Sequence, residues 1–163
     1  MVGRFLAGIG AVVWAPALAR YVLLKRSPHK DFAPGVWECV TGRVDQGEGF
    51  AEALIREVRE ELGVTVAPDF VIGTTHFYRG AAQPGNELLG VVYHCSLSTP
   101  EAIRLSAEHT AVRWVTLAEA RGVLRPENPS EAWLLRVLVR ANALRTLLPA
   151  EVIEMQRFGM EMR

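Results

Sequence analysis

The chain has 163 residues, half of them hydrophobic, and a formal net charge of zero at neutral pH. This length suits one domain with a real core, and the composition argues against disorder. A neutral chain without a basic run lacks the electrostatic footprint of a protein that binds long DNA or RNA. Cys39 and Cys95 lie in separate apolar segments. They indicate buried thiols of a reducing, cytoplasmic compartment, not a disulfide or a zinc site.

The N-terminal residues resemble a secretory signal at first sight. Arg4, an apolar run over residues 5–14 and the sequence Ala17-Leu18-Ala19 imitate a signal with its cleavage site. The run is too short to cross a membrane. A second apolar segment follows at residues 20–25, after a turn at Pro16. We therefore expect a β-hairpin here, and no membrane partner.

The remaining elements alternate between strand-like and helix-like patterns. Gly63 is a natural C-terminal cap for a helix over residues 50–62, and Thr116 to Glu119 form a capping box. The pattern predicts strands at 3–14, 20–25, 36–41, 70–78, 88–97 and 110–116, a short helix at 116–121 and a long helix at 128–147. Strands mixed with helices indicate one α/β domain over residues 1–149. Residues 150–163 are expected to be a frayed helix or a tail of the same domain that packs on a partner subunit.

Four carboxylates are concentrated around the helix over residues 50–62. Glu48 precedes it in a glycine-rich loop, while Glu57, Glu60 and Glu61 fall within a sector of roughly 100° on one helix face. Clustered like charges repel one another unless a cation compensates them. Hard divalent ions such as Mg²⁺ prefer oxygen ligands and often bridge carboxylates to substrate phosphates. The helix face therefore predicts a metal site.

The segment over residues 42–64 resembles the signature of the Nudix hydrolase family, G-x5-E-x7-R-E-U-x-E-E-x-G-U with U aliphatic. All nine specified positions are filled, by Gly42, Glu48, Arg56, Glu57, Val58, Glu60, Glu61, Gly63 and Val64. The resemblance implies an α/β/α sandwich with a mixed sheet between helices. It also implies metal-dependent hydrolysis of a pyrophosphate bond in a nucleoside diphosphate linked to another moiety, with Mg²⁺ or Mn²⁺ as cofactor.

The same resemblance implies roles for individual residues. Glu57 and Glu61 would ligate the metal directly, Glu60 would act as a ligand or a base, and Glu48 would bind through water or fix the helix. Arg56 would pair with an acidic group such as Glu48 or Glu60. Residues 108–114 resemble a Glu-His-x-x-x-Arg-Trp pattern of some members. It makes Glu108 a candidate base or additional ligand, with a solvated loop carboxylate as the alternative and His109 as a weaker candidate.

Substrate choice depends on shorter cues. Val40-Thr41-Gly42 replaces the commoner Pro-Gly-Gly, and resembles the branch that cleaves dihydroneopterin triphosphate and deoxynucleoside triphosphates. The alternatives are an ADP-ribose or diadenosine polyphosphate hydrolase, or a nucleotide sensor without turnover. The loop over residues 27–35 is expected to border the pocket of a monomer or homodimer. The candidate contacts to a small nucleotide are Arg26, Trp37, Gly42 and Tyr78, with Lys25, Arg79 and Arg113 as further phosphate contacts and Phe77 as a further stacking ring.

Overall fold

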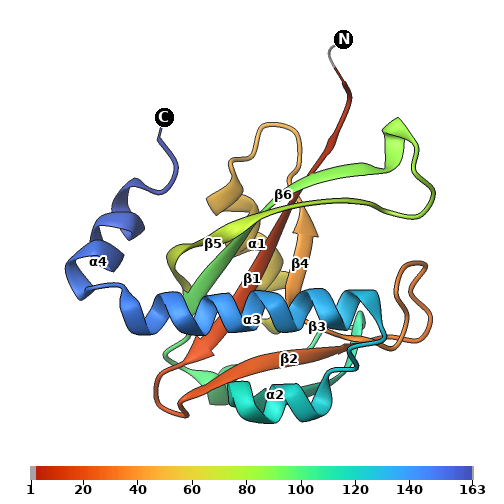
Figure 1. The fold of residues 1–163 in the computed structure, drawn as a ribbon. Coiled ribbons are helices and arrows are strands. Elements are labelled where there is room, and N and C mark those ends of the chain that lie inside the picture. Colours follow the sequence, from red (N-terminus) through yellow and green to blue (C-terminus); the bar gives the residue numbers. More distant parts are fainter. Residues whose placement is uncertain (1–2, 163) are drawn as a thin grey trace.

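The computed structural model describes residues 3–162, apart from the side chains of residues 158 and 159. A mixed sheet runs through the middle of the molecule, with α3 in front of it and α1 behind it (Figure 1). The strands are β1 (Leu6–Ala15), β2 (Arg20–Arg26), β3 (Trp37–Glu38), β4 (Val40–Arg43), β5 (Ala67–Tyr78), β6 (Glu87–Ser96) and β7 (His109–Val115). The α-helices are α1 (Phe50–Leu62), α2 (Leu117–Val123), α3 (Pro129–Leu147) and α4 (Ala150–Gly159). The expected α/β/α sandwich is confirmed.

The sheet is mixed because one pairing in it is parallel. Its central path is β3-β2-β1-β6-β5, with β4 pairing β1 and β7 pairing β2. Strand β1 runs parallel to β6, and the other pairs are antiparallel. β1 and β2 pair only near their turn, at Trp14–Tyr21 and Ala15–Arg20. They diverge beyond it, so each takes a different neighbour further along.

The predicted strand over residues 36–41 is wrong in one respect, because it is two strands. β3 pairs with β2, whereas β4 pairs with β1, and Cys39 lies between them. The chain crosses here from one diverging strand to the other. A single strand over residues 36–41 would place Glu38 and Thr41 on opposite faces. With the break, the Thr41 hydroxyl is within hydrogen-bonding distance of the Glu38 carboxylate, at 3.4 Å.

Two apolar layers hold the helices against the sheet. Alternate residues of β1 explain them, since successive strand side chains point to opposite faces. Ile9, Ala11 and Val13 pack with Val58 and other residues of α1, while Val12 packs on the side of α3. Each helix therefore has a fixed position relative to β1, and β1 carries part of the site described below.

The C-terminal segment packs on its own chain. Helix α4 contacts β5, and the Arg157 guanidinium pairs with the buried Asp69 carboxylate. Beyond the helix, Glu161 accepts a hydrogen bond from the Ala51 backbone N–H at the start of α1, at 3.1 Å. These contacts form because a buried carboxylate attracts the Arg157 cation and a helix N-terminus attracts the Glu161 carboxylate. The expected packing of this segment on a partner subunit stays a prediction. The boundary at residue 149 stays a prediction.

The structure bears on the expectations for the N-terminal apolar run and for the two cysteines. The N-terminal apolar run forms β1, as the hairpin interpretation predicts. Cys39 and Cys95 are both buried and free. Across residues 3–162, the helices are too short or too polar to cross a bilayer.

Candidate metal and substrate site

Local capping interactions fix both ends of helix α1. The Glu52 side chain accepts a hydrogen bond from the Gly49 backbone N–H at the N-terminus. Gly63 ends the helix in the left-handed conformation, with φ of 68°, which glycine adopts without a steric penalty. Leu54, Val58 and other apolar residues of the helix are fully buried. This burial fixes the rotation of α1 and with it the direction of the acidic face.

Gly42 allows the Glu57 side chain to reach across β4. A Cβ atom at position 42 would overlap the Glu57 carboxyl group. Gly42, Glu57 and Glu61 all line one cavity of about 600 Å³, which is a typical size for a small-ligand pocket. The glycine of the signature is therefore a steric requirement here, because a side chain would displace the carboxylate.

The electrostatics of Glu57 and Glu61 fit a divalent cation. Burial, followed by the charges of Glu38, Glu57 and Glu108, raises the pKa of the Glu61 carboxyl to about 9. Burial also raises the pKa of Glu57. Oε2 of Glu61 is buried and has no hydrogen-bond partner in the described part of the chain. A buried acceptor without a donor is costly, and a cation in contact with it would remove that cost.

The number of carboxylates is also compatible with Mg²⁺. No three His, Cys, Asp or Glu side chains among residues 3–162 are arranged to hold an ion by themselves. Mg²⁺ usually keeps several waters and takes one or two carboxylates together with substrate phosphates. Glu57 and Glu61 would thus hold the ion, with substrate completing its coordination.

Arg56 joins the loop to the helix. Its guanidinium donates to Glu48 Oε1 at 2.7 Å and Oε2 at 2.9 Å, and to Glu57 Oε1 at 2.9 Å. It also reaches Glu60 at 3.4 Å and the Arg43 carbonyl at 2.9 Å. The Arg56 hydrogen bond is the main cause of a lowered Glu48 pKa, to about 2. Arg56 therefore positions Glu57, whereas Glu60 is mostly exposed and lies outside the residues that line the cavity.

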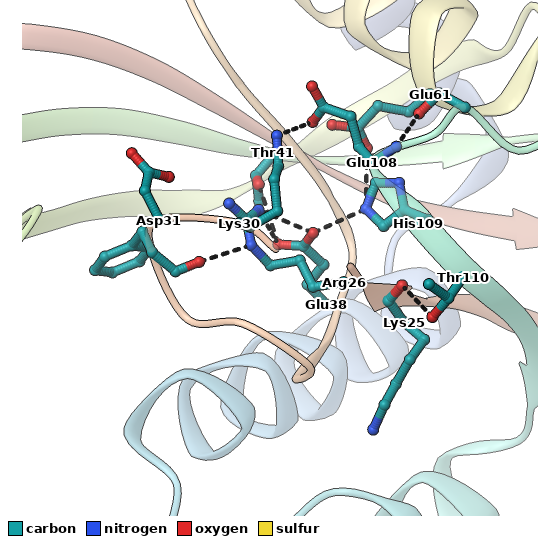
Figure 2. Close-up of polar contacts among 12 residues, drawn as sticks. Lys25, Arg26, Lys30, Asp31, Glu38, Thr41, Glu61, Glu108, His109 and Thr110 are labelled. Carbon is teal, nitrogen blue, oxygen red and sulfur yellow. Dashed lines mark hydrogen bonds and ion pairs between the residues drawn. The ribbon is translucent and has the colours of Figure 1, made fainter. Parts of the chain in front are cut away.

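A second charged cluster lies beside Glu61, and sequence reasoning missed its centre, Glu38. Glu38 accepts from Arg26 at 3.0 Å and contacts His109 Nε2 at 2.8 Å (Figure 2). The same His109 nitrogen is 3.8 Å from Oε2 of Glu61. Glu38 lies outside the signature over residues 42–64. Its only indication in the sequence is a charged residue within a short apolar strand, next to Trp37.

Glu108 projects toward the cavity from the loop before β7. Its carboxylate is half-exposed and pairs with the Lys30 ammonium at 2.6 Å. That hydrogen bond is the main cause of a lowered Glu108 pKa. The pair brings a carboxylate and a cation from two loops to the wall that also carries Glu57 and Glu61. Its place is compatible with a base or an additional ligand, and the role stays a prediction.

The other expected substrate residues divide into two groups. Arg26, Gly42, Tyr78, Phe77 and Arg79 line the cavity. Trp37, Lys25 and Arg113 lie outside its lining, and the Lys25 ammonium instead lies 5.1 Å from the centre of the Trp37 ring. Trp37 packs in the apolar layer on the side of α3. This half-buried position outside the cavity lining argues against a stacking role.

The fold and site define an α/β protein that places a buried and a partly buried carboxylate at the wall of a ligand-sized cavity. The NUDIX domain family matches residues 4–138, and the chain belongs to this family. Among solved structures, the MutT protein of Methanosarcina mazei Go1 has a TM-score of 0.70 at 22% identity, over 89% of this chain and 98% of that chain. The expectation of a Nudix domain is thereby confirmed.

Curated relatives carry several different names. An octanoyltransferase of Myxococcus xanthus is 38% identical over 106 residues, which are 63% of this chain and 28% of that protein. The NAD-capped RNA hydrolase NudC of Stutzerimonas stutzeri is 31% identical, over 77% of this chain and 41% of that protein. The CTP pyrophosphohydrolase of Escherichia coli is 30% identical, over 80% of this chain and 88% of that protein. The chain spans less than half the length of the first two.

Proposed function

We propose that the protein is a metal-dependent pyrophosphohydrolase of small nucleotides. The observation that carries this proposal is a pair of carboxylates, the buried Glu61 and the partly buried Glu57, at the wall of one cavity beside Gly42. Bound Mg²⁺ or Mn²⁺ would neutralise phosphate charge and lower the pKa of a water. Family membership and a relative named CTP pyrophosphohydrolase support the same reaction.

The chain's own residues would divide the work as follows. Glu57 and Glu61 hold the cation, and Arg56 fixes the Glu57 rotamer through its 2.9 Å hydrogen bond. Glu108 takes the proton from the attacking water. Lys30, which pairs with Glu108 and lines the cavity, leaves this pair to bind a substrate phosphate. Water then attacks phosphorus and the pyrophosphate bond breaks.

The finer substrate proposal is a nucleoside triphosphate or dihydroneopterin triphosphate. It is supported by the Val40-Thr41-Gly42 form of the loop entry, where Thr41 lines the cavity and its hydroxyl is 3.4 Å from Glu38. A panel of nucleotides with Mg²⁺ and Mn²⁺, with released phosphate and pyrophosphate as readouts, tests both the reaction and the substrate. ADP-ribose and diadenosine polyphosphates belong in the same panel.

The metal assignment is tested by Glu57→Gln and Glu61→Gln. Both should lower kcat by at least about a hundredfold, because the charge that holds the cation is lost. Glu61→Gln should also raise the thermal stability of the metal-free protein at neutral pH. The raised pKa of Glu61 means that folding requires this carboxyl to take up a proton, and glutamine avoids that cost. The stabilisation that Mg²⁺ gives to the wild type should disappear.

Glu101→Gln, on an exposed residue far from the cavity lining, is the matched control. If one of the two variants keeps full activity and normal Mg²⁺ stabilisation, the residue that it replaces is not a metal ligand. Absence of hydrolysis by wild type across the panel, with Mg²⁺ binding intact, would favour a nucleotide sensor.

A further inference from the structure

An aromatic wall, Phe32 and Phe77, lines the same cavity as the metal-site carboxylates. The two rings are nearly parallel, with an interplanar angle of 24° and centroids 6.3 Å apart. Phe77 is 37% exposed although it is a large apolar side chain. Arg79 lies beside this wall, 5.7 Å from the Phe32 ring, and is held by Asp31 at 3.2 Å. An aromatic pair that is partly exposed inside a cavity is a surface that a planar apolar ligand would cover.

The aromatic wall and the metal site lie at separate ends of the cavity. Gly42 of β4 is opposite Ile9 of β1, Ile9 is opposite Val91 of β6, and Val91 is opposite Thr74 of β5. Three strand spacings separate β4 from β5, which is roughly 14 Å. Phe77 lies three residues beyond Thr74, which adds roughly 10 Å along the strand. A ligand that touches both ends must be elongated.

The floor between these ends is low because β1 carries glycines there. Gly8 and Gly10 line the cavity. A Cβ atom at Gly8 would lie 3.0 Å from a Leu88 methyl group, and one at Gly10 would lie 3.3 Å from a Val92 methyl group. The glycines therefore let Leu88 and Val92, which also line the cavity, pack down onto β1. A side chain at either glycine position would push them into the path from Phe77 to Glu57.

We propose that Phe77 and Phe32 form a nucleobase subsite, with the base stacked on Phe77 and the phosphates lying across the glycine floor at Glu57 and Glu61. The proposal rests on the proposed function for the direction of the ligand. For a base to contact an aromatic ring on each of its faces, the centroids of the two flanking rings must be about 7–8 Å apart. Phe32 lies in the loop before β3, so a base between the rings would displace it outward by about 1 Å. Stacking is tolerant of base identity, which predicts similar use of purine and pyrimidine nucleotides.

The test compares Phe77→Leu and Phe32→Leu with Phe5→Leu. Phe5 is 51% exposed and lies outside the cavity lining, which makes the last variant a matched control. We measure KM and kcat with Mg²⁺ for ATP, CTP and methyl triphosphate, which has no base. Phe77→Leu should raise the KM of both nucleotides by about five- to a hundredfold, and Phe32→Leu by less, with kcat and the KM of methyl triphosphate unchanged.

A second measurement separates this subsite from the reaction. Calorimetric binding of α,β-methylene ATP in the presence of Mg²⁺ should weaken by the same factor in Phe77→Leu, whether or not the wild type hydrolyses ATP. Unchanged nucleotide KM and binding in both variants would overturn the subsite. An equal rise in the KM of methyl triphosphate would overturn it too, since that result indicates general damage to the cavity.

Discussion

At the scale of single residues, the site depends on where side chains are absent as much as on where they are present. Gly42 leaves room for the Glu57 carboxylate, and Gly8 and Gly10 leave room for Leu88 and Val92 to form a low cavity floor. Arg56 then restrains Glu57 from the opposite side. The carboxylates are thus directed by steric gaps and by one guanidinium.

Gly42→Ala tests the steric part of this description. The added methyl group overlaps the Glu57 carboxyl, so the carboxylate must move and kcat should fall by about tenfold or more. The free energy of unfolding should change by less than about 2 kcal/mol, because Glu57 can rotate toward the cavity. Steady-state kinetics and urea unfolding measure the two effects. Gly85→Ala is the control, since nothing lies within 4 Å of its Cβ position; equal kinetics in the two variants would contradict the argument.

Glu108→Gln tests the assignment of the base. Loss of a general base lowers kcat by about 10²- to 10⁴-fold, while KM stays nearly constant because the amide still occupies the same place. Single-turnover and steady-state rates provide the measurement, with Glu101→Gln as the exposed control. A variant that retains the wild-type kcat would show that Glu108 is an ordinary loop carboxylate paired with Lys30.

At the scale of elements, the N-terminus of α3 is fixed to the strand that leads to Glu38. The Asn128 side chain caps α3 by accepting from the backbone N–H groups of Ser130 and Glu131. Glu131 is fully buried and accepts from the Trp37 backbone N–H at 3.0 Å and from Arg125 at 2.8 Å. This carboxylate thereby sets the position of β3 and of the charged cluster around Glu38.

The pH dependence of the free energy of unfolding should reveal the contribution of Glu131. Its burial opposes ionisation, but hydrogen bonds from Arg125 and the Trp37 backbone outweigh it and lower the pKa to about 2, from 4.5. A depressed folded-state pKa stabilises the fold above pH 4.5, and that stabilisation is lost as pH falls toward 2. Glu131→Gln should cost about 1–3 kcal/mol at pH 7 and progressively less below pH 4.5. Urea unfolding over this range measures it, with the exposed Glu127→Gln as control; a difference independent of pH would contradict the assignment.

At the scale of the whole molecule, the divergence of β1 and β2 brings the parts of the site together. β4 pairs with β1, and this pairing places Gly42 beside α1. β3 pairs with β2, and this pairing places Glu38 beside His109 of β7. The C-terminal segment adds a further tie, from Arg157 to Asp69 and from Glu161 to the first turn of α1. The N-terminal turn of α1 is therefore held by a long-range contact with the C-terminal segment.

The sequence by itself determined the acidic helix, its caps and the family. Glu57 and Glu61 are one helical turn apart, so their common face follows from local geometry alone. The order of strands and helices followed from periodicity for the same reason. These features depend on residues that are near one another in the chain.

Only the tertiary structure decided which distant residues complete the site. The separation of residues 36–41 into two strands, the Glu38 cluster, the Lys30–Glu108 pair and the Phe32–Phe77 wall all depend on pairings between remote segments. Trp37 packs half-buried against the α3 side, outside the cavity lining. Phe32, in the loop expected to border the pocket, lines the cavity and pairs with Phe77, which no local pattern indicated. A strand's partners determine which face its side chains occupy, and no local pattern specifies those partners.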